Sequence, residues 1–352
     1  MTIENKYAGI DFFRIPAALL VVAIHTSPLA TWSEGADFFL TRVLARIAVP
    51  FFFMVTGQFI LSDYLYKRKV NSVRIWRYIR KILMLYGVSI LLYLPVGIYA
   101  GHYKNLTIQS ALRMLFFDGP FYHLWYFPAC VIGTILVCLL GRFLESKGIF
   151  IVTGFLYLIG LFGDSYFGLT ESVPFIAEIY EKGFRIWSYT RNGLFLAPVF
   201  LALGAALENR KECRKKYMLI FGFGCSLFLM SVEAFTLRYL GFQRHDSMYI
   251  MLIPTMAFLY QILLIPSALS GHFTKLSMLR TISTVIYIIH PAMIVVTRSI
   301  AKISEIDALI DNSLLHYICV VLLSLAASFF TAALLERKKK TELSPEQNMD
   351  RN

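Results

Sequence analysis

The chain has few charged residues and few cysteines. Asp, Glu, Lys and Arg make up 16% of its 352 residues, whereas 57% of the residues are hydrophobic. This balance excludes an ordinary soluble domain. Five cysteines without a C-x-x-C or H-E-x-x-H spacing predict neither a disulfide framework nor a metal site. No small-residue cleavage site follows the first apolar run, so we expect a retained helix there rather than a signal peptide.

Acidic residues are also scarce, and the surplus of basic residues orients the chain. The net charge of +12 also suits nucleic-acid binding. However, 22 of the 34 Lys and Arg residues fall on one side of the membrane if the N-terminus is cytoplasmic and the chain crosses ten times. Cytoplasmic loops of membrane proteins carry such an excess. The distribution therefore predicts cytoplasmic N- and C-termini and makes nucleic acid unnecessary as a partner.

Apolar runs near the ~20 residues that span a bilayer recur along the chain. They predict ten transmembrane helices, at about 10–31, 38–62, 76–100, 122–143, 148–167, 191–209, 216–236, 248–269, 280–301 and 313–336. The predicted fold class is an all-α polytopic membrane protein. Residues 1–336 form its membrane domain, and the polar, charged residues 337–352 form a disordered cytoplasmic tail or a linker. The outer loops 101–121 and 165–190 are long enough for a short surface helix each.

Two ionisable residues, Arg14 and His25, lie within the first predicted helix. Eleven residues separate them, so they share one helix face about 16 Å apart along the axis. Arg14 either extends to the inner headgroups, paired with Asp11, or has a functional role. His25 is either a buried, hydrogen-bonded core residue or a general base that takes a proton from an attacking hydroxyl.

The second predicted helix carries Arg42 and Arg46 one turn apart, followed by VPFFFMVTG. Arg42 is suited to marking the interface, and the deeper Arg46 is a candidate for a polar cavity and for substrate binding. Pro50 and Gly57 can distort the helix and let other groups approach its backbone.

Further polar residues gather towards the outer ends of the predicted helices and suggest a polar cavity that opens outward. The other candidates for substrate binding are His123, Trp125, Arg191, Asn192, His245, Asp246 and His290. Trp125 also suits the ordinary role of an interface anchor. His290 precedes Pro291 near the middle of a predicted helix, where a histidine is an unusual choice for packing alone.

A basic segment precedes the third predicted helix. Arg74, Arg77, Tyr78 and Lys81 fall on one face. They either orient the chain in the membrane and contact anionic headgroups or, with Arg80, bind the phosphates of a cytosolic donor such as coenzyme A.

Several of these motifs together resemble the acyltransferase-3 superfamily. They are the Arg-x10-His spacing of Arg14 and His25, VPFFFMVTG at 49–57, the basic residues Arg77, Arg80 and Lys81, HLWYF at 123–127 and IYIIHP at 286–291. The resemblance implies about ten membrane helices and O-acylation of extracytoplasmic sugars, with His25 as the catalytic base, Arg14 beside it in the motif and acyl-coenzyme A as the donor.

A narrower resemblance is to the membrane domain of membrane-bound serine racemases from bacterial vancomycin-resistance systems. It rests on YHLWYFPA, LIGLFGDSYFGL, TRNGLF and HDSMY. In that family the membrane domain precedes a pyridoxal-phosphate-dependent racemase domain in the cytosol and is thought to bring L-serine to it. The 352 residues hold no racemase domain, so the resemblance implies a separately encoded racemase partner and no cofactor in this chain.

Three functions remain open at this point. The first is L-serine uptake, in which Arg46 or Arg191 binds the carboxylate and Asp164 or Asp246 binds the ammonium. The second is an O-acyltransferase with His25 as base. The third is a passive membrane anchor for a racemase, for which ten helices with intramembrane charges are excessive. The predicted location is the bacterial cell membrane, and the predicted partners are the lipid bilayer, L-serine or an acyl acceptor, and the racemase.

Overall fold

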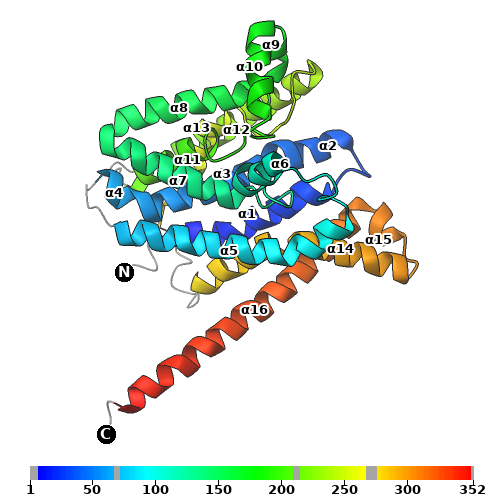
Figure 1. Cartoon of the computed structure of the whole chain (residues 1–352). Helices are drawn as coiled ribbons and strands as arrows, with labels where there is room; N and C mark the ends of the chain where they lie inside the picture. Colours follow the sequence, from blue (N-terminus) through cyan, green and yellow to red (C-terminus); the bar gives the residue numbers. More distant parts are fainter. Residues whose placement is uncertain (1–6, 67–71, 209–214, 267–275, 350–352) are drawn as a thin grey trace. The chain divides into compact units, whose positions relative to one another are not determined.

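The computed structural model describes residues 7–66, 72–208, 215–266 and 276–349. Within these ranges the chain forms helices and connecting segments without a strand (Figure 1). The chain divides into two compact units, 1–48 with 263–352 and 49–262. This confirms the predicted all-α fold class.

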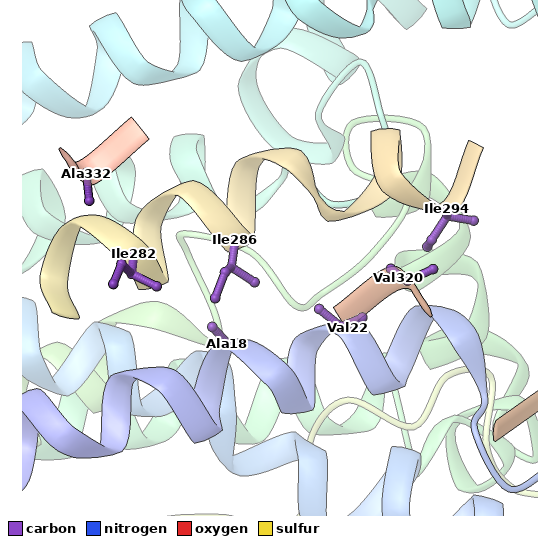
Figure 2. Packing of buried hydrophobic residues seen from close by; sticks show 7 residues of the cluster. All are labelled: Ala18, Val22, Ile282, Ile286, Ile294, Val320 and Ala332. Atoms are coloured by element: carbon purple, nitrogen blue, oxygen red, sulfur yellow. The ribbon is translucent and has the colours of Figure 1, made fainter. Parts of the chain in front are cut away.

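Unit 1 joins the first helix to the last two long helices. Its helices are α1 (Ala8–Thr26), α2 (Glu34–Phe38), the π-helix η2 (Phe39–Val43), the 3-10 helix η3 (Leu44–Ile47), α14 (Leu276–Ile303), α15 (Ala308–Asp311) and α16 (Ser313–Met349). Ala18 and Val22 of α1 pack with Ile282, Ile286 and Ile294 of α14 and with Val320 of α16 (Figure 2). These contacts bury small and branched side chains, which lets the helices approach closely.

Unit 2 holds the remaining helices. They are α3 (Ala48–Thr56), the π-helix η4 (Gly57–Leu61), α4 (Ser62–Tyr66), α5 (Ser72–Tyr99), α6 (Ile108–Arg113), the π-helix η5 (Met114–Asp118), α7 (Tyr126–Phe143), α8 (Ser146–Phe162), α9 (Phe167–Glu171), α10 (Pro174–Phe184), α11 (Ala197–Glu208), α12 (Lys216–Tyr239) and α13 (Leu252–Leu263). Both outer loops contain short helices, α6 in one and α9 with α10 in the other, as expected.

Gly57 is the site of a close helix contact, as its place in the second predicted span suggested. A Cβ added there would lie 2.0 Å from the carbonyl oxygen of Leu201 on α11, and one added to Gly204 would lie 2.0 Å from that of Met54. The backbones of α3, η4 and α11 therefore meet directly. The 3-10 helix η3 precedes Pro50, whose missing N–H and ring favour such irregular geometry in the turn before it.

Seven of the described helical stretches are long and apolar enough to cross a membrane. They are Ala8–Thr26, Glu34–Tyr66, Ser72–Tyr99, Tyr126–Phe143, Lys216–Tyr239, Leu276–Ile303 and Ser313–Lys338. The other three predicted spans coincide with the shorter apolar helices α8, α11 and α13. A helix of 12 residues such as α11 is about 18 Å long, shorter than the ~30 Å hydrocarbon core. Helix length thus supports seven of the ten predicted spans.

The predicted disordered tail is helical over most of its length. Helix α16 continues to Met349, and of the predicted tail only residues 350–352 lie outside the described residues. The run of Glu, Arg and Lys that begins the tail consists of good helix formers, so a helix that starts in the membrane segment can continue through it.

Candidate functional site

Two histidines from different helices form a stacked pair in unit 1. The rings of His25 and His290 have centroids 5.3 Å apart and an interplanar angle of 22°. His25 lies in the last turn of α1, and His290 lies within α14 with no solvent exposure. Both residues were predicted from the sequence, but as members of different sites, because no sequence spacing relates positions 265 residues apart.

Pro291 determines the protonation pattern of His290. A proline cannot donate to the carbonyl four residues earlier, so the carbonyl of Tyr287 lacks its helical partner. His290 Nδ1 lies 2.9 Å from that oxygen and 3.2 Å from the carbonyl oxygen of Ile286. Both neighbours are acceptors, so Nδ1 carries the proton and Nε2 carries a lone pair. In the neutral ring, Nε2 is therefore the unprotonated nitrogen of the pair.

Arg14 lies in an ion cluster rather than alone on α1. Its Nε donates to Oδ1 of Asp11 at 3.0 Å, as its expected pairing required. Arg280 of α14 binds the same carboxylate through two bonds, Nε to Oδ1 at 2.9 Å and Nη2 to Oδ2 at 2.7 Å. Asp11 is only 1% exposed, so its charge needs these partners. This cluster ties α1 to α14 at the end opposite His25.

Arg46 is buried in unit 1, with 8% exposure. It lies on η3, which packs against α1. Burying a cation within a membrane is energetically costly, so Arg46 remains a candidate for a functional role.

A second group, here called the outer cluster, forms in unit 2 around Ser247. It consists of Trp125, Asp164, Tyr189, Arg191 and Ser247. The Arg191 guanidinium lies over the rings of Tyr189 and Trp125, at 4.4 and 5.4 Å from their centroids. Its Nη1 donates to Oγ of Ser247 at 3.4 Å. The backbone N–H of Ser247 in turn donates to Oδ1 of Asp164 at 2.7 Å. A cation and a carboxylate therefore contact one residue from two sides.

Asp164 is fully buried just beyond the end of α8, outside the membrane-spanning helices. Its Oδ1 also accepts from the N–H of Met248 and the hydroxyl of Ser165. Within the described chain, Oδ2 has no hydrogen-bond partner. Burial raises the pKa of Asp164 above its ordinary value, while the Ser247 N–H and the Arg191 charge oppose the rise. Of the two acidic residues proposed for an ammonium group, this one is the more buried.

Glycine at position 163 lets these segments meet. A Cβ there would lie 2.5 Å from Cγ2 of Thr190, and the Thr190 hydroxyl donates to the carbonyl of Gly160 at 2.7 Å. The end of α8, which leads to Asp164, thereby packs against the segment that carries Arg191.

The neighbour of Arg191 has a different role. The Asn192 side chain accepts from the N–H groups of Leu194 and Phe195 at 2.9 and 3.2 Å and donates to the carbonyl of Tyr189. It is 1% exposed. Its amide holds the turn before α11, and its contact with a substrate stays a prediction.

The other residues predicted for the outer cavity lie outside the outer cluster or at its edge. His123 is buried against Tyr93, with ring centroids 4.9 Å apart, and against Phe121. His245 packs on Tyr189 at 4.5 Å, at the edge of the outer cluster. Asp246 is half-buried, and its charge contributes to the raised pKa of Asp164.

The basic residues at the start of α5 are exposed. Arg74 contacts Asp63 at 3.3 Å in an exposed ion pair, and Arg77, Arg80 and Lys81 are also exposed. Tyr78, expected on the same face, instead turns inward and shares a hydrogen bond of 3.1 Å with Thr56. A phosphate clamp at these residues stays a prediction.

Glu233 is a further carboxylate, half-buried and not among the residues predicted from the sequence. It lies on α12 and accepts from the N–H groups of Ile250 and Met251 at 2.6 and 2.9 Å and from the hydroxyl of Tyr166 at 2.8 Å. The signal was present, because Glu233 is the one acidic residue in the apolar run 216–236. Among the residues that the structure describes, no group of His, Cys, Asp and Glu is placed to hold a metal ion.

Comparisons with known proteins agree with this architecture. An acyltransferase domain model, that of the acyltransferase-3 family, matches residues 7–333. An amino-acid racemase of Enterococcus faecalis is 38% identical over 100% of this chain and 48% of its own length. A serine/alanine racemase of Enterococcus gallinarum is 35% identical over 91% of this chain and 45% of its own length. The chain thus spans about half the length of these relatives. No solved structure matches. The chain belongs to the acyltransferase-3 family, and its similarity to these relatives fits their membrane domain.

Proposed function

We propose that this protein is the membrane component of a serine racemase system in bacterial vancomycin resistance and that it carries L-serine to a cytosolic racemase. The names of the relatives support the racemase system. The outer cluster carries the transport proposal, because it holds an arginine and a buried carboxylate on either side of Ser247.

A free amino acid requires this pair of charges. Its carboxylate matches the fork of N–H donors on a guanidinium, which Arg191 offers between two aromatic rings. Its ammonium needs a buried acceptor, and Asp164 Oδ2 has the required charge and no other partner within the described chain.

We further propose that all ten apolar helices cross the membrane, with both termini in the cytoplasm. The short helices α11 and α13 each follow a hydrogen-bonded segment, at 190–196 and 244–251, of which the first is mostly buried and the second is buried at 247–249. Non-helical backbone is tolerated at membrane depth where protein surrounds it. The parts of these segments that adjoin α11 and α13 supply length that the two helices lack, and the parts that contact Asp164 lie beyond the membrane.

Uptake of radiolabelled L-serine into proteoliposomes tests the transport proposal. We expect saturable uptake by the unaltered protein and loss of uptake in Arg191→Ala. The matched control is Arg185→Ala, which removes an exposed arginine from the same connection between α10 and α11. Uptake no higher than in empty liposomes, or an equal loss in both variants, would contradict the proposal.

A second candidate function is O-acyl transfer from acyl-coenzyme A to an extracytoplasmic hydroxyl. The His25–His290 pair favours it, because a ring with an unprotonated nitrogen lies against the family's predicted base. His25 would take the hydroxyl proton while the oxygen attacks the acyl carbonyl and the thiolate of coenzyme A leaves. Consumption of acyl-coenzyme A that is lost in His25→Ala would support this function over transport. If the protein shows neither serine uptake nor consumption of acyl-coenzyme A, the result favours the passive membrane anchor.

A further inference from the structure

A groove opens in unit 2 between α5 and α7, near the basic start of α5. Its volume is about 420 Å³. On α5 it is lined by Ser72, Ile75, Trp76 and Ile79, which share one helix face because they are three, four and seven residues apart. Ser72 begins the helix, so this wall changes from polar to apolar over about 10 Å.

The opposite wall also changes from polar to apolar, but here the polar residue is at the C-terminal end of the helix. Ile135, Leu139 and Arg142 of α7 line it at helical spacing, with Arg142 in the last turn. The helices α5 and α7 run in opposite directions (Figure 1). The polar Ser72 and Arg142 therefore lie at one end of the groove, and Ile79 and Ile135 lie at the other.

We propose that this groove binds one anionic phospholipid, with an acyl chain along the isoleucines and the headgroup at Arg142. A free phosphate is a poor occupant, because the apolar lining would leave most of its charge without polar partners. Trp76 is 64% exposed at the groove, and tryptophan at this level suits the interface between chains and headgroups. The exposed Arg77, about 8 Å from Ser72 along the axis of the same helix, adds positive potential for an anionic headgroup. The cytoplasmic leaflet as the source rests on the proposed orientation, but lipid binding itself does not.

Quenching of Trp76 by brominated lipids tests the proposal. The chain has four tryptophans, so the variant Trp32→Phe, Trp125→Phe, Trp187→Phe leaves Trp76 as the sole reporter. We expect half-maximal quenching at about fivefold lower mole fraction of brominated phosphatidylglycerol than of brominated phosphatidylcholine, the factor that corresponds to ~1 kcal/mol per basic residue at a surface.

Two variants identify the headgroup contact. Arg142→Gln and Ser72→Glu should each remove most of the preference for phosphatidylglycerol. Lys147→Gln removes the same charge from the start of α8, away from the groove lining, and should keep the preference. Ser72→Glu suits a helix N-terminus and keeps the test informative if Arg142→Gln fails to fold.

Three results would overturn the proposal. They are equal quenching by the two lipids, an equal effect of Lys147→Gln and Arg142→Gln, and displacement of the brominated lipid by long-chain acyl-coenzyme A at equimolar amounts. The last result would make the groove a donor site instead. Serine uptake is measured separately, so failure of either proposal leaves the other standing.

Discussion

The imidazole of His290 replaces a hydrogen bond that Pro291 removes from α14. A proline inside a helix leaves a carbonyl without its N–H partner, and here that carbonyl belongs to Tyr287 and lies 2.9 Å from His290 Nδ1. The pairing of a histidine with the next residue's proline thus fixes one tautomer without an acidic partner. Nε2 is left with its lone pair beside the ring of His25.

The variant Pro291→Ala should loosen this tautomer. The new N–H at position 291 would compete for the Tyr287 carbonyl, so we expect a measurable fraction of His290 with the proton on Nε2. Nitrogen-15 NMR of histidine-labelled protein distinguishes the two forms. Pro128→Ala, which changes a proline near the start of α7, is the control and should leave the His290 signal unchanged. An unchanged signal in Pro291→Ala would refute this account.

Asp164→Asn separates charge from structure in the outer cluster. Asparagine keeps an oxygen for the Ser247 and Met248 N–H groups but loses the charge for an ammonium. We expect the KM for serine uptake to rise by about 10- to 100-fold, the worth of a hydrogen bond to a charged group. Asp246→Asn removes the half-buried neighbour and should change KM much less. A larger effect of Asp246→Asn would reassign the ammonium site.

The same carboxyl should give uptake a pH dependence. Asp164 binds an ammonium only when ionised, so KM should rise as the pH falls through its pKa. Burial raises that pKa, so we expect the rise in KM to begin above the ordinary aspartate value of about 3.9. The profile of Asp164→Asn should lack this step, and a step that persists in the variant would assign the titration to another group.

One ion cluster holds α1 against α14. Asp11 is buried, and two arginines from the two helices bind it. Arg280→Ala should therefore destabilise the protein by about 2 kcal/mol, below the 3–5 kcal/mol of a fully buried pair because Arg280 is half-exposed. For a chain of 352 residues this corresponds to about 3 °C in the midpoint of thermal unfolding. Arg298→Ala, an exposed arginine on the same helix, is the control and should cost much less.

The length of the apolar runs predicted the helices well and their ends less well. Each predicted span contains a helix because about 20 apolar residues leave the backbone few other ways to satisfy its hydrogen bonds in lipid. The short α11 and α13 were not predicted, because the turns before them depend on Asn192, Asp164 and Glu233. The bonds of Asn192 are local side-chain contacts that an apolar run does not reveal, and those of Asp164 and Glu233 join residues far apart in the chain. The pairing of His25 with His290 and of Asp11 with Arg280 escaped prediction for the same reason.

The distribution of Lys and Arg along the full chain predicts which loops face the cytoplasm. In a variant with the native cysteines replaced, Glu178→Cys on α10 should react with a membrane-impermeant maleimide added to intact cells. Glu145→Cys, between α7 and α8, should react only after permeabilisation. Both glutamates are exposed, so a difference reports sidedness rather than burial. Labelling of Glu145→Cys in intact cells would contradict the proposed orientation.

The two carboxylates that bind the segment before α13 also take the place of water as hydrogen-bond acceptors. Asp164 accepts the N–H groups of Ser247 and Met248, and Glu233 accepts those of Ile250 and Met251. Four amides of a non-helical stretch are thus occupied by side chains instead of water. Their hydrogen–deuterium exchange should be as slow as that of a helix interior, although neighbouring loops exchange quickly. Rigidity in this part of the chain comes from two acidic side chains, not from secondary structure.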